Sequence, residues 1–335
     1  MKIIFWAILF SFSFKVWGNK CLENRAAINM GAYNTKLVVG QIDFCKIKIV
    51  KFLLEKEVVL NFADPLKGKS EVSLALQISA MEKLKKMVDL ANRFNPVHIA
   101  FIPSKFFKTT TNYMSFFKKI REDLKVKIFL PDLETEAILG FLGVKIKYPQ
   151  APNKLLVWDM GANGSNWTML DKNLDFKVYF EKMNPKTFKN MVIEGVLKKD
   201  YKQVNSPNPL GDKNAKKALD LIKLYTSYNT PEMLKKRAKE FKVVGIGGFH
   251  NKSIMNQLGV GGSSYNLKQL ESALGKVSSL SDKEIKGPFP SYQVTNLILA
   301  MGLLNTLGLD QIYTTNVNEA HGALMYPKYW KITSK

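Results

Sequence analysis

The chain has 335 residues, of which 46% are hydrophobic, so it is long enough and apolar enough to bury the cores of two domains. This composition excludes a disordered chain. Its 50 basic and 28 acidic residues give a formal charge of +22, which favours a polyanionic partner, although a basic proteome or solubility explains such a charge equally well. Because the sequence has no zinc-finger spacing, arginine-rich arm or RNA-binding aromatic signature, we expect no sequence-specific nucleic-acid binding.

The first residues are typical of a secretion signal. Lys2 precedes the run IIFWAILFSFSF, which is too short to cross a bilayer as a helix but matches the hydrophobic region of a signal peptide. We therefore predict a signal peptide over residues 1–18 and an exported protein, periplasmic or extracellular. After cleavage we expect no membrane contact. An uncleaved membrane anchor is the alternative.

The following residues predict a first α/β lobe. Short β-rich runs over residues 25–30 and 36–43 are joined by a Gly-Ala-Tyr-Asn turn, and with a third run over residues 46–60 they predict a β-meander. A helical pattern covers residues 70–94, with Ser70 as its N-cap. Strands and helices then alternate, with strands over 98–103 and 126–130 and helices over 112–124 and 134–146. This order predicts an α/β lobe over residues 24–145.

A second lobe repeats this plan. The run KLLVWDM leads into a glycine-containing turn and returns as NWTML and FKVYFE, after which helices over residues 188–199 and 213–239 precede a strand over residues 241–248. We predict a second α/β lobe over residues 146–318, which faces the first lobe across a cleft. A C-terminal segment, residues 319–335, is expected to pack back near this cleft. The expected fold class is α/β, with two similar lobes on either side of that cleft.

Both lobes begin with nearly the same turn. AINMGAYNT and VWDMGANGS each place an acid or its amide two residues before a glycine, as Asn29 before Gly31 and Asp159 before Gly161. The backbone N–H groups of such a turn converge on an anion, and a carboxylate at the strand end can hold a divalent cation against the same phosphate oxygens. We therefore expect the two turns to face each other across the cleft and to bind phosphate.

A third glycine-rich turn, GIGGFHN, lies between a strand and an expected helix, where N-terminal amides also favour an anion. Two other motifs are incomplete. The Gly-Lys-Ser run at residues 68–70 has Ala63 where a Walker A loop needs its first glycine. The third turn has His250 where a dinucleotide fingerprint needs a glycine, so neither a Walker loop nor an NAD site is predicted.

These motifs, in this order, resemble the exopolyphosphatase and guanosine pentaphosphate phosphohydrolase (Ppx/GppA) family of the actin-like phosphotransferase superfamily. INMGAYNTKLVVGQID resembles its first phosphate turn, PDLETEAILGFLGV its glutamate helix, LLVWDMGANGSNWTML its second phosphate turn and VVGIGGFHNKSI its third glycine-rich element. PSYQVTNLILAMGLLNTLGLDQIYTTNVNEAHGALM is similar to its closing segment. The resemblance covers most of the chain after the signal and implies two actin-like (ribonuclease H-like) lobes around a phosphate-binding cleft.

The resemblance also implies a Mg²⁺-dependent hydrolase that acts on polyphosphate or a phosphorylated nucleotide. Glu136 matches the general base that activates the attacking water; a solvated helix residue is the alternative for it. Asp159 matches the acid that holds Mg²⁺, and Asn29 takes the corresponding place in the first turn. The implied phosphate-binding residues are Gly31, Thr35, Lys36, Gly161, Asn163, Gly164, Ser165, Gly247 and Gly248.

Departures from the family pattern leave the activity open. The family has an aspartate at Asn29 and a glutamate at Asn166, and each amide removes a negative charge that would hold the cation. Only Lys105 and Lys108 stand where the family has a phosphate-binding arginine, and lysine lacks the bidentate fork. Two functions remain: an exported phosphatase, or a degenerate relative that binds a polyanion or a protein partner without turnover. A kinase or ATPase is a weaker third interpretation, and the oligomeric state, a homodimer included, stays open.

The two cysteines stand close to the first predicted hairpin. If residues 25–43 pair about the turn, continuing the pairing outward brings Cys21 near the position opposite Cys45. An oxidising compartment would then allow a disulfide. Two reduced, buried thiols are the alternative.

Overall fold

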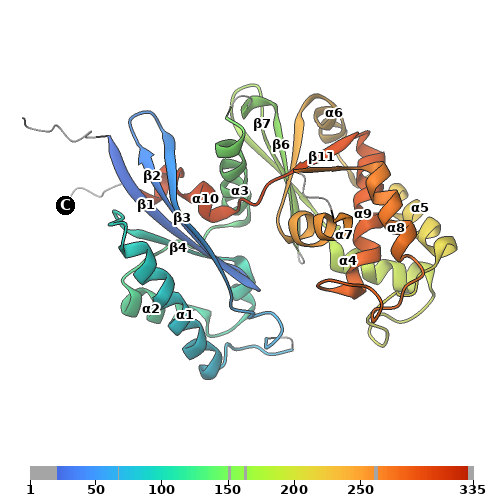
Figure 1. Ribbon diagram of the computed structural model, residues 1–335, viewed down its shortest axis with the longest axis horizontal. Helices are drawn as coiled ribbons and strands as arrows, with labels where there is room; N and C mark the ends of the chain where they lie inside the picture. The colour runs from blue at the N-terminus through green and yellow to red at the C-terminus, as the bar shows by residue number, and fades with distance from the viewer. Residues whose placement is uncertain (1–20, 67, 150–151, 162–163, 260–262, 331–335) are drawn as a thin grey trace, which may run out of the picture.

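The computed structural model describes residues 21–330, apart from residues 67, 150–151, 162–163 and 260–262. The predicted signal peptide and Asn163 lie outside the described residues. The chain forms two α/β lobes, each built on one sheet (Figure 1), which confirms the predicted fold class.

The first sheet begins with an antiparallel meander of β1 (Leu22–Met30), β2 (Asn34–Asp43) and β3 (Lys48–Val59). Two further strands, β4 (Ile99–Pro103) and β5 (Lys127–Ile128), run parallel to β1, giving the order β3-β2-β1-β4-β5. Side chains alternate between the two faces of a strand. In β1, Ala26, Ile28 and Met30 therefore pack into one core and Ala27 into another.

Helices α1 (Leu74–Asn92) and α2 (Tyr113–Leu124) cover the face of this sheet that carries Ile28 (Figure 1). The predicted start of α1 was wrong. Its N-cap is Ser73, whose hydroxyl accepts a hydrogen bond from the backbone of Leu76, and not Ser70. The helix therefore begins three residues later than expected, because Ser73 satisfies a free backbone N–H of its first turn.

The second sheet repeats the first. Its meander consists of β6 (Leu155–Gly161), β7 (Gly164–Leu170) and β8 (Phe176–Glu181), and β9 (Lys242–Ile246) and β11 (Gln311–Thr314) add in parallel. The order β8-β7-β6-β9-β11 matches β3-β2-β1-β4-β5 strand for strand. A short antiparallel strand, β10 (Ser264–Asn266), extends its edge. The two lobes thus share one topology.

The helices of the second lobe surround α9 (Pro290–Leu307), which is apolar on all sides and almost wholly buried. They are α4 (Pro185–Met191), α5 (Asp212–Asn229), α6 (Glu232–Glu240), α7 (Met255–Leu258) and α8 (Leu267–Val277). The predicted single helix over residues 213–239 was wrong, because Pro231 separates α5 from α6. Proline has no N–H to donate and disfavours helical backbone in the residue before it.

Between the two sheets lie α3 (Leu133–Lys147) and α10 (Glu319–Ala323) (Figure 1). They pack so closely that a Cβ on Gly322 would lie 1.8 Å from the carbonyl oxygen of Leu139. The C-terminal segment therefore returns to the first lobe, where Ala320 and Leu324 join the core that contains Ala27. In the described part of the chain, no helix combines the length and apolar character needed to cross a membrane.

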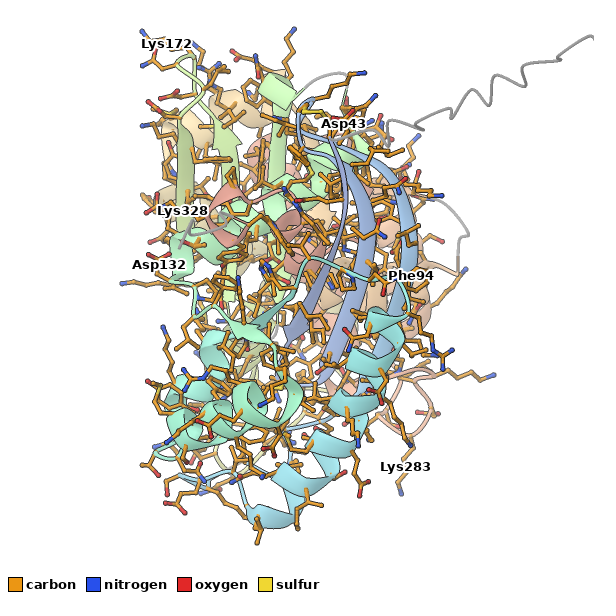
Figure 2. All side chains as sticks on the ribbon, turned by 90° about the vertical axis from the view of Figure 1, so that its left-hand side faces the viewer. Asp43, Phe94, Asp132, Lys172, Lys283 and Lys328 are labelled. Carbon is orange, nitrogen blue, oxygen red and sulfur yellow. A yellow bond between two sulfur atoms is a disulfide. The ribbon has the colours of Figure 1, made fainter. Side chains whose placement is uncertain are left out.

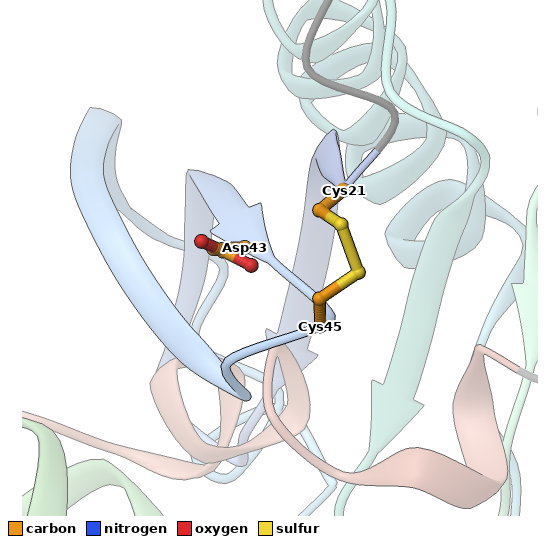
Figure 3. Close-up of side chains that lie close together, drawn as sticks. All are labelled: Cys21, Asp43 and Cys45. Atoms are coloured by element: carbon orange, nitrogen blue, oxygen red, sulfur yellow. A yellow bond between two sulfur atoms is a disulfide. The ribbon is translucent and has the colours of Figure 1, made fainter.

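Cys21 and Cys45 form a disulfide, with Cα atoms 5.4 Å apart (Figure 3), which confirms the predicted bridge. The bond ties the start of β1 to the loop between β2 and β3. Beside it, the buried Asp43 accepts a hydrogen bond from the backbone N–H of Lys46 at 3.0 Å. This loop and the matching loop after β7, which contains Lys172, lie at the same end of the molecule (Figure 2).

Candidate active site

A cavity of about 160 Å³ opens between the lobes, and both sheets contribute to it at the ends of their strands. The first lobe supplies Asn29, Asn34 and Lys36 from the turn between β1 and β2. The rest of the lining follows β6, β9 and β11: Asp159, Ile246, Gly247, Gly248, Asn251, Lys252, Asn316, Val317, Asn318 and Glu319. The two similar turns therefore contribute to one cavity.

Asp159 stands near the end of β6, opposite Asn166 in the β6–β7 ladder. Burial raises the pKa of Asp159 well above its usual value, and the charges of Glu319 and Glu136 raise it further, whereas a hydrogen bond from Asn166 lowers it. Gly247 packs directly on this carboxylate. A Cβ there would lie 2.7 Å from Asp159 Oδ1, and Gly247 has φ of +88°, so the third turn requires glycine at this position.

Asn29 stands at the corresponding place in β1, opposite Lys36. Its Nδ2 donates a long, 3.5 Å hydrogen bond to the carbonyl of Ile102. The ammonium group of Lys36 donates to Asn316 Oδ1 at 3.3 Å and lies 3.8 Å from Glu57 Oε2. Lys36 thus crosses from the first lobe to the second, at the side of the cavity.

Glu136 lies in the first turn of α3, after Asp132, which caps the helix by accepting a hydrogen bond from the backbone of Thr135 at 2.7 Å. The backbone N–H of Lys105 donates to Glu136 Oε1 at 2.9 Å. Burial raises the pKa of Glu136 to about 7, the charge of Glu319 adds to this, and the bond from Lys105 opposes it. Glu136 is therefore a partly buried carboxyl group that exchanges its proton near neutral pH.

Lysines surround these acids. The ammonium of Lys105 lies 3.7 Å from where a Cβ on Gly164 would stand, so this side chain reaches from the first lobe to the second turn. Lys252, which comes from the second lobe and lines the cavity, forms an ion pair with Glu57 of β3, the same carboxylate that lies near Lys36. Cations from both lobes thus meet the place where the acids gather, a combination suited to a phosphate with a metal ion.

Comparisons with known proteins agree with this architecture. No protein-family model matches the chain. The bifunctional 3-dehydroquinate synthase/phosphatase of Fusobacterium nucleatum is 20% identical over 324 residues, which cover 90% of this chain but only 46% of that protein. The chain thus spans about half the length of this curated relative.

Two solved structures match the whole described fold. The Ppx/GppA enzyme of Aquifex aeolicus superposes with a TM-score of 0.72 at 14% identity, covering 91% of this chain and 99% of that one. An exopolyphosphatase of Cytophaga hutchinsonii gives a TM-score of 0.64 at 14% identity, covering 90% and 96%. The chain has the Ppx/GppA fold.

Within this fold, only some of the predicted site residues line the cavity between the lobes. Asn29, Lys36, Asp159, Gly247 and Gly248 line the cavity. The side chains of Thr35 and Ser165 are buried, and the Ser165 hydroxyl accepts a hydrogen bond from Trp158 at 3.1 Å. The glycines Gly31, Gly161 and Gly164 belong to the two turns but do not line the cavity.

The sequence analysis missed Glu319 and the asparagines beside it. Glu319 opens α10, directly after the segment that follows β11, and its charge acts on both Glu136 and Asp159. A signal for these residues was present, because they follow the strand β11. This strand runs parallel to β9, and ligands of α/β sheets bind beyond the carboxyl ends of such strands. The polar run Asn316–Glu319 stands at that end.

The donors around the cavity fit a magnesium ion shared with phosphate. Asp159 and Glu319 offer carboxylate oxygens, and Asn29 an amide oxygen. In the part of the chain that the structure describes, these acids form no tight three-residue cluster; the group that does is Cys21, Asp43 and Cys45, whose sulfurs are already bonded to each other. Mg²⁺ commonly binds through one or two carboxylates and substrate phosphates, so an all-protein cage is not required.

Proposed function

We propose that the chain is a Ppx/GppA-type phosphatase that hydrolyses the terminal phosphate of polyphosphate or a related phosphoanhydride. One observation carries the proposal: the backbone of Lys105 holds Glu136, whose pKa burial raises to about 7, near enough to Asp159 for the charge of Glu136 to raise the pKa of Asp159, although Glu136 itself does not line the cavity. A carboxylate in this state is suited to accept a proton from water at neutral pH.

Glu136 acts as the general base. Its free oxygen takes a proton from the water that attacks the terminal phosphorus, while the hydrogen bond from Lys105 keeps the carboxylate oriented. General bases of this kind contribute about 10²- to 10⁴-fold to the rate. The base is active when ionised, so activity rises with pH through the pKa of Glu136.

The remaining residues bind and orient the phosphate. Lys36 and Lys252 supply positive charge at the cavity, Lys105 supplies it beside the second turn, and the third turn offers backbone at Gly247 and Gly248. Asp159, Glu319 and Asn29 would hold Mg²⁺, which when bound neutralises charge on the phosphoryl oxygens. Fixed charges of this kind stabilise a transition state in which phosphate charge is spread over several oxygens.

We further propose that the protein acts outside the cytoplasm. The Cys21–Cys45 disulfide supports this, since disulfides persist in oxidising compartments. The secretion-like run at the start of the sequence supports it independently.

Phosphate release tests the proposal. The purified protein is assayed with polyphosphate, a pentaphosphate guanosine nucleotide and ATP, with and without Mg²⁺, beside Glu136→Gln and Glu134→Gln. Glu134 is exposed two residues earlier in the same helix, so its variant is a matched control. We expect Glu136→Gln to lower turnover by about 10²- to 10⁴-fold and Glu134→Gln to leave it unchanged. No Mg²⁺-dependent release by the wild type from any of the three would refute the proposed function and leave a non-catalytic binding role.

A further inference from the structure

The loop between β2 and β3, residues 44–47, exposes apolar side chains where a loop is usually polar. Ile47 is 70% exposed and Phe44 is 43% exposed, and Val50 and Leu22 are exposed beside them. Lysines 46, 48 and 51 alternate with these residues and are also exposed. We call residues Phe44–Lys51, with Leu22, the hairpin tip.

The backbone of the hairpin tip holds Ile47 in an unfavourable conformation. Its φ is +49°, in the left-handed region that asparagine and glycine tolerate and a β-branched residue strongly disfavours. For folding alone, a polar residue such as asparagine would be more favourable than isoleucine at position 47. Such a costly choice, maintained by a disulfide at Cys45 and the Asp43 turn, points to a function for the exposed isoleucine.

The matching loop of the second lobe shows what the fold itself requires. Leu174 is likewise 58% exposed with φ of +67°, but it stands between Asp171 and Asp175. Asp171 accepts hydrogen bonds from the backbone of Asn173 and Asp175 and pairs with Lys177. The two loops have similar shapes. The first joins several exposed apolar residues to lysines, whereas the second has one exposed leucine, and there Asp171 and Asp175 offset the charges of Lys172 and Lys177.

We propose that the hairpin tip docks on an anionic lipid bilayer, with Phe44 and Ile47 entering the interface and the lysines contacting headgroup phosphates. Two observations select a bilayer as the occupant. Alternating apolar and basic side chains match its acyl region and its charge. The second applies to the uncleaved anchor, the alternative to the signal peptide: its apolar run ends at Phe14, and the chain then enters the fold at Cys21, which is bonded to this tip.

A hollow behind the hairpin tip extends the apolar surface. It measures about 210 Å³ and is lined by Ile42, Phe44, Ile47, Met325 and Trp330, among others. The proposal departs from the expectation that the exported chain makes no membrane contact. It lies on the first lobe, away from the residues that line the cavity between the lobes, so docking does not depend on the proposed phosphatase activity.

Vesicle partition tests the proposal with the purified full-length protein. The probes are phosphatidylcholine vesicles with and without about 30% phosphatidylglycerol, a fraction large enough to give a strongly negative surface. We expect binding only to the anionic vesicles and at least about tenfold weaker partition for Ile47→Asn combined with Phe44→Ser. Asparagine relieves the left-handed strain at residue 47, so an undiminished melting temperature shows that folding is intact. Leu174→Asn, at the matching position, should change partition less than about twofold.

A second readout separates the hairpin tip from residues 1–20, which are common to all variants. Phe44→Trp should gain fluorescence that lipids brominated on their acyl chains quench, whereas Leu174→Trp should not. Equal partition of wild type on neutral and anionic vesicles would overturn the proposal. So would full partition of the double variant together with unquenched fluorescence of Phe44→Trp, a result that would assign any binding to the N-terminal run.

Discussion

The two phosphate turns share one backbone plan but carry different charges. In the first, Asn29 lies opposite Lys36 across the ladder; in the second, the equivalent pair is Asp159 and Asn166. The first turn therefore presents an amide and a cation to the cavity. The second presents the carboxylate of Asp159, to which Asn166 is hydrogen-bonded. The comparison teaches that one backbone geometry, repeated in both lobes, can carry an amide and a cation in one copy and a carboxylate in the other.

Among changes to the two turns, substituting the acid of one and the amide of the other should have the largest effect. Asp159→Asn removes the carboxylate of the second turn, and we expect phosphate release at fixed Mg²⁺ to fall by about 10²- to 10³-fold. Asn29→Asp adds a carboxylate to the first turn and should lower the Mg²⁺ concentration for half-maximal activity severalfold. Magnesium titrations of both variants check this. Equal effects of the two substitutions would show that the turns are not divided in function.

Reducing the disulfide should destabilise the first lobe, since both cysteines lie there. The bond joins residues 24 positions apart, and closing a loop of that length contributes about 3 kcal/mol by the chain-entropy model. Thermal melts of wild type and of the Cys21→Ser, Cys45→Ser double variant measure the difference. Two free thiols per chain in the denatured, unreduced protein would contradict the bridge.

Two adjacent glycines of the third turn allow a sharper test of the second lobe. A Cβ on Gly247 would lie 2.6 Å from the carbonyl oxygen of Met160 and 2.7 Å from Asp159 Oδ1, whereas a Cβ on Gly248 meets nothing within 4 Å. We expect Gly247→Ala to lower the free energy of unfolding by about 2 kcal/mol and to impair activity by displacing Asp159. Gly248→Ala should change stability by less than about 0.5 kcal/mol. Urea unfolding of both variants distinguishes these outcomes.

The smallest effect concerns pH and stability. A carboxyl whose pKa is raised on folding stabilises the protein below its unfolded value and loses that contribution as pH rises through the folded value. For Glu136 this window runs from about 4.5 to about 7. Metal-free protein should therefore lose on the order of 1 kcal/mol from this group between pH 5 and pH 8, and Glu136→Gln should lessen the loss. A steeper loss of stability in Glu136→Gln than in the wild type would argue against a raised pKa at Glu136.

Much of the fold could be predicted because its signals are local. The alternation of strands and helices, the repeated Asx-Met-Gly-Ala turn and the outward continuation of the first hairpin to Cys21 and Cys45 are all written in short stretches. The break at Pro231 was missed although its signal is also local, because the helical pattern continues on both sides of the proline. The start of α1 depended on which of two serines, Ser70 or Ser73, found a backbone partner.

The site was less predictable because its charges come from distant segments. Asp159 and Glu136 belong to visible motifs, but the effect of Glu319 depends on α10 returning to pack against α3, where Gly322 allows contact with Leu139. Sequence patterns name the groups, whereas packing decides which of them reach the cavity.

The pH dependence of kcat/KM for phosphate release, measured at saturating Mg²⁺ from pH 5 to pH 9, tests the central claim most directly. With Glu136 as the general base, the wild-type value should fall about tenfold per pH unit below an apparent pKa near 7, the pKa of the free enzyme's base. The low residual activity of Glu136→Gln should lack that limb, and Glu134→Gln should keep it. A wild-type profile that is flat from pH 5 to pH 8, or a limb that persists in Glu136→Gln, would contradict the account.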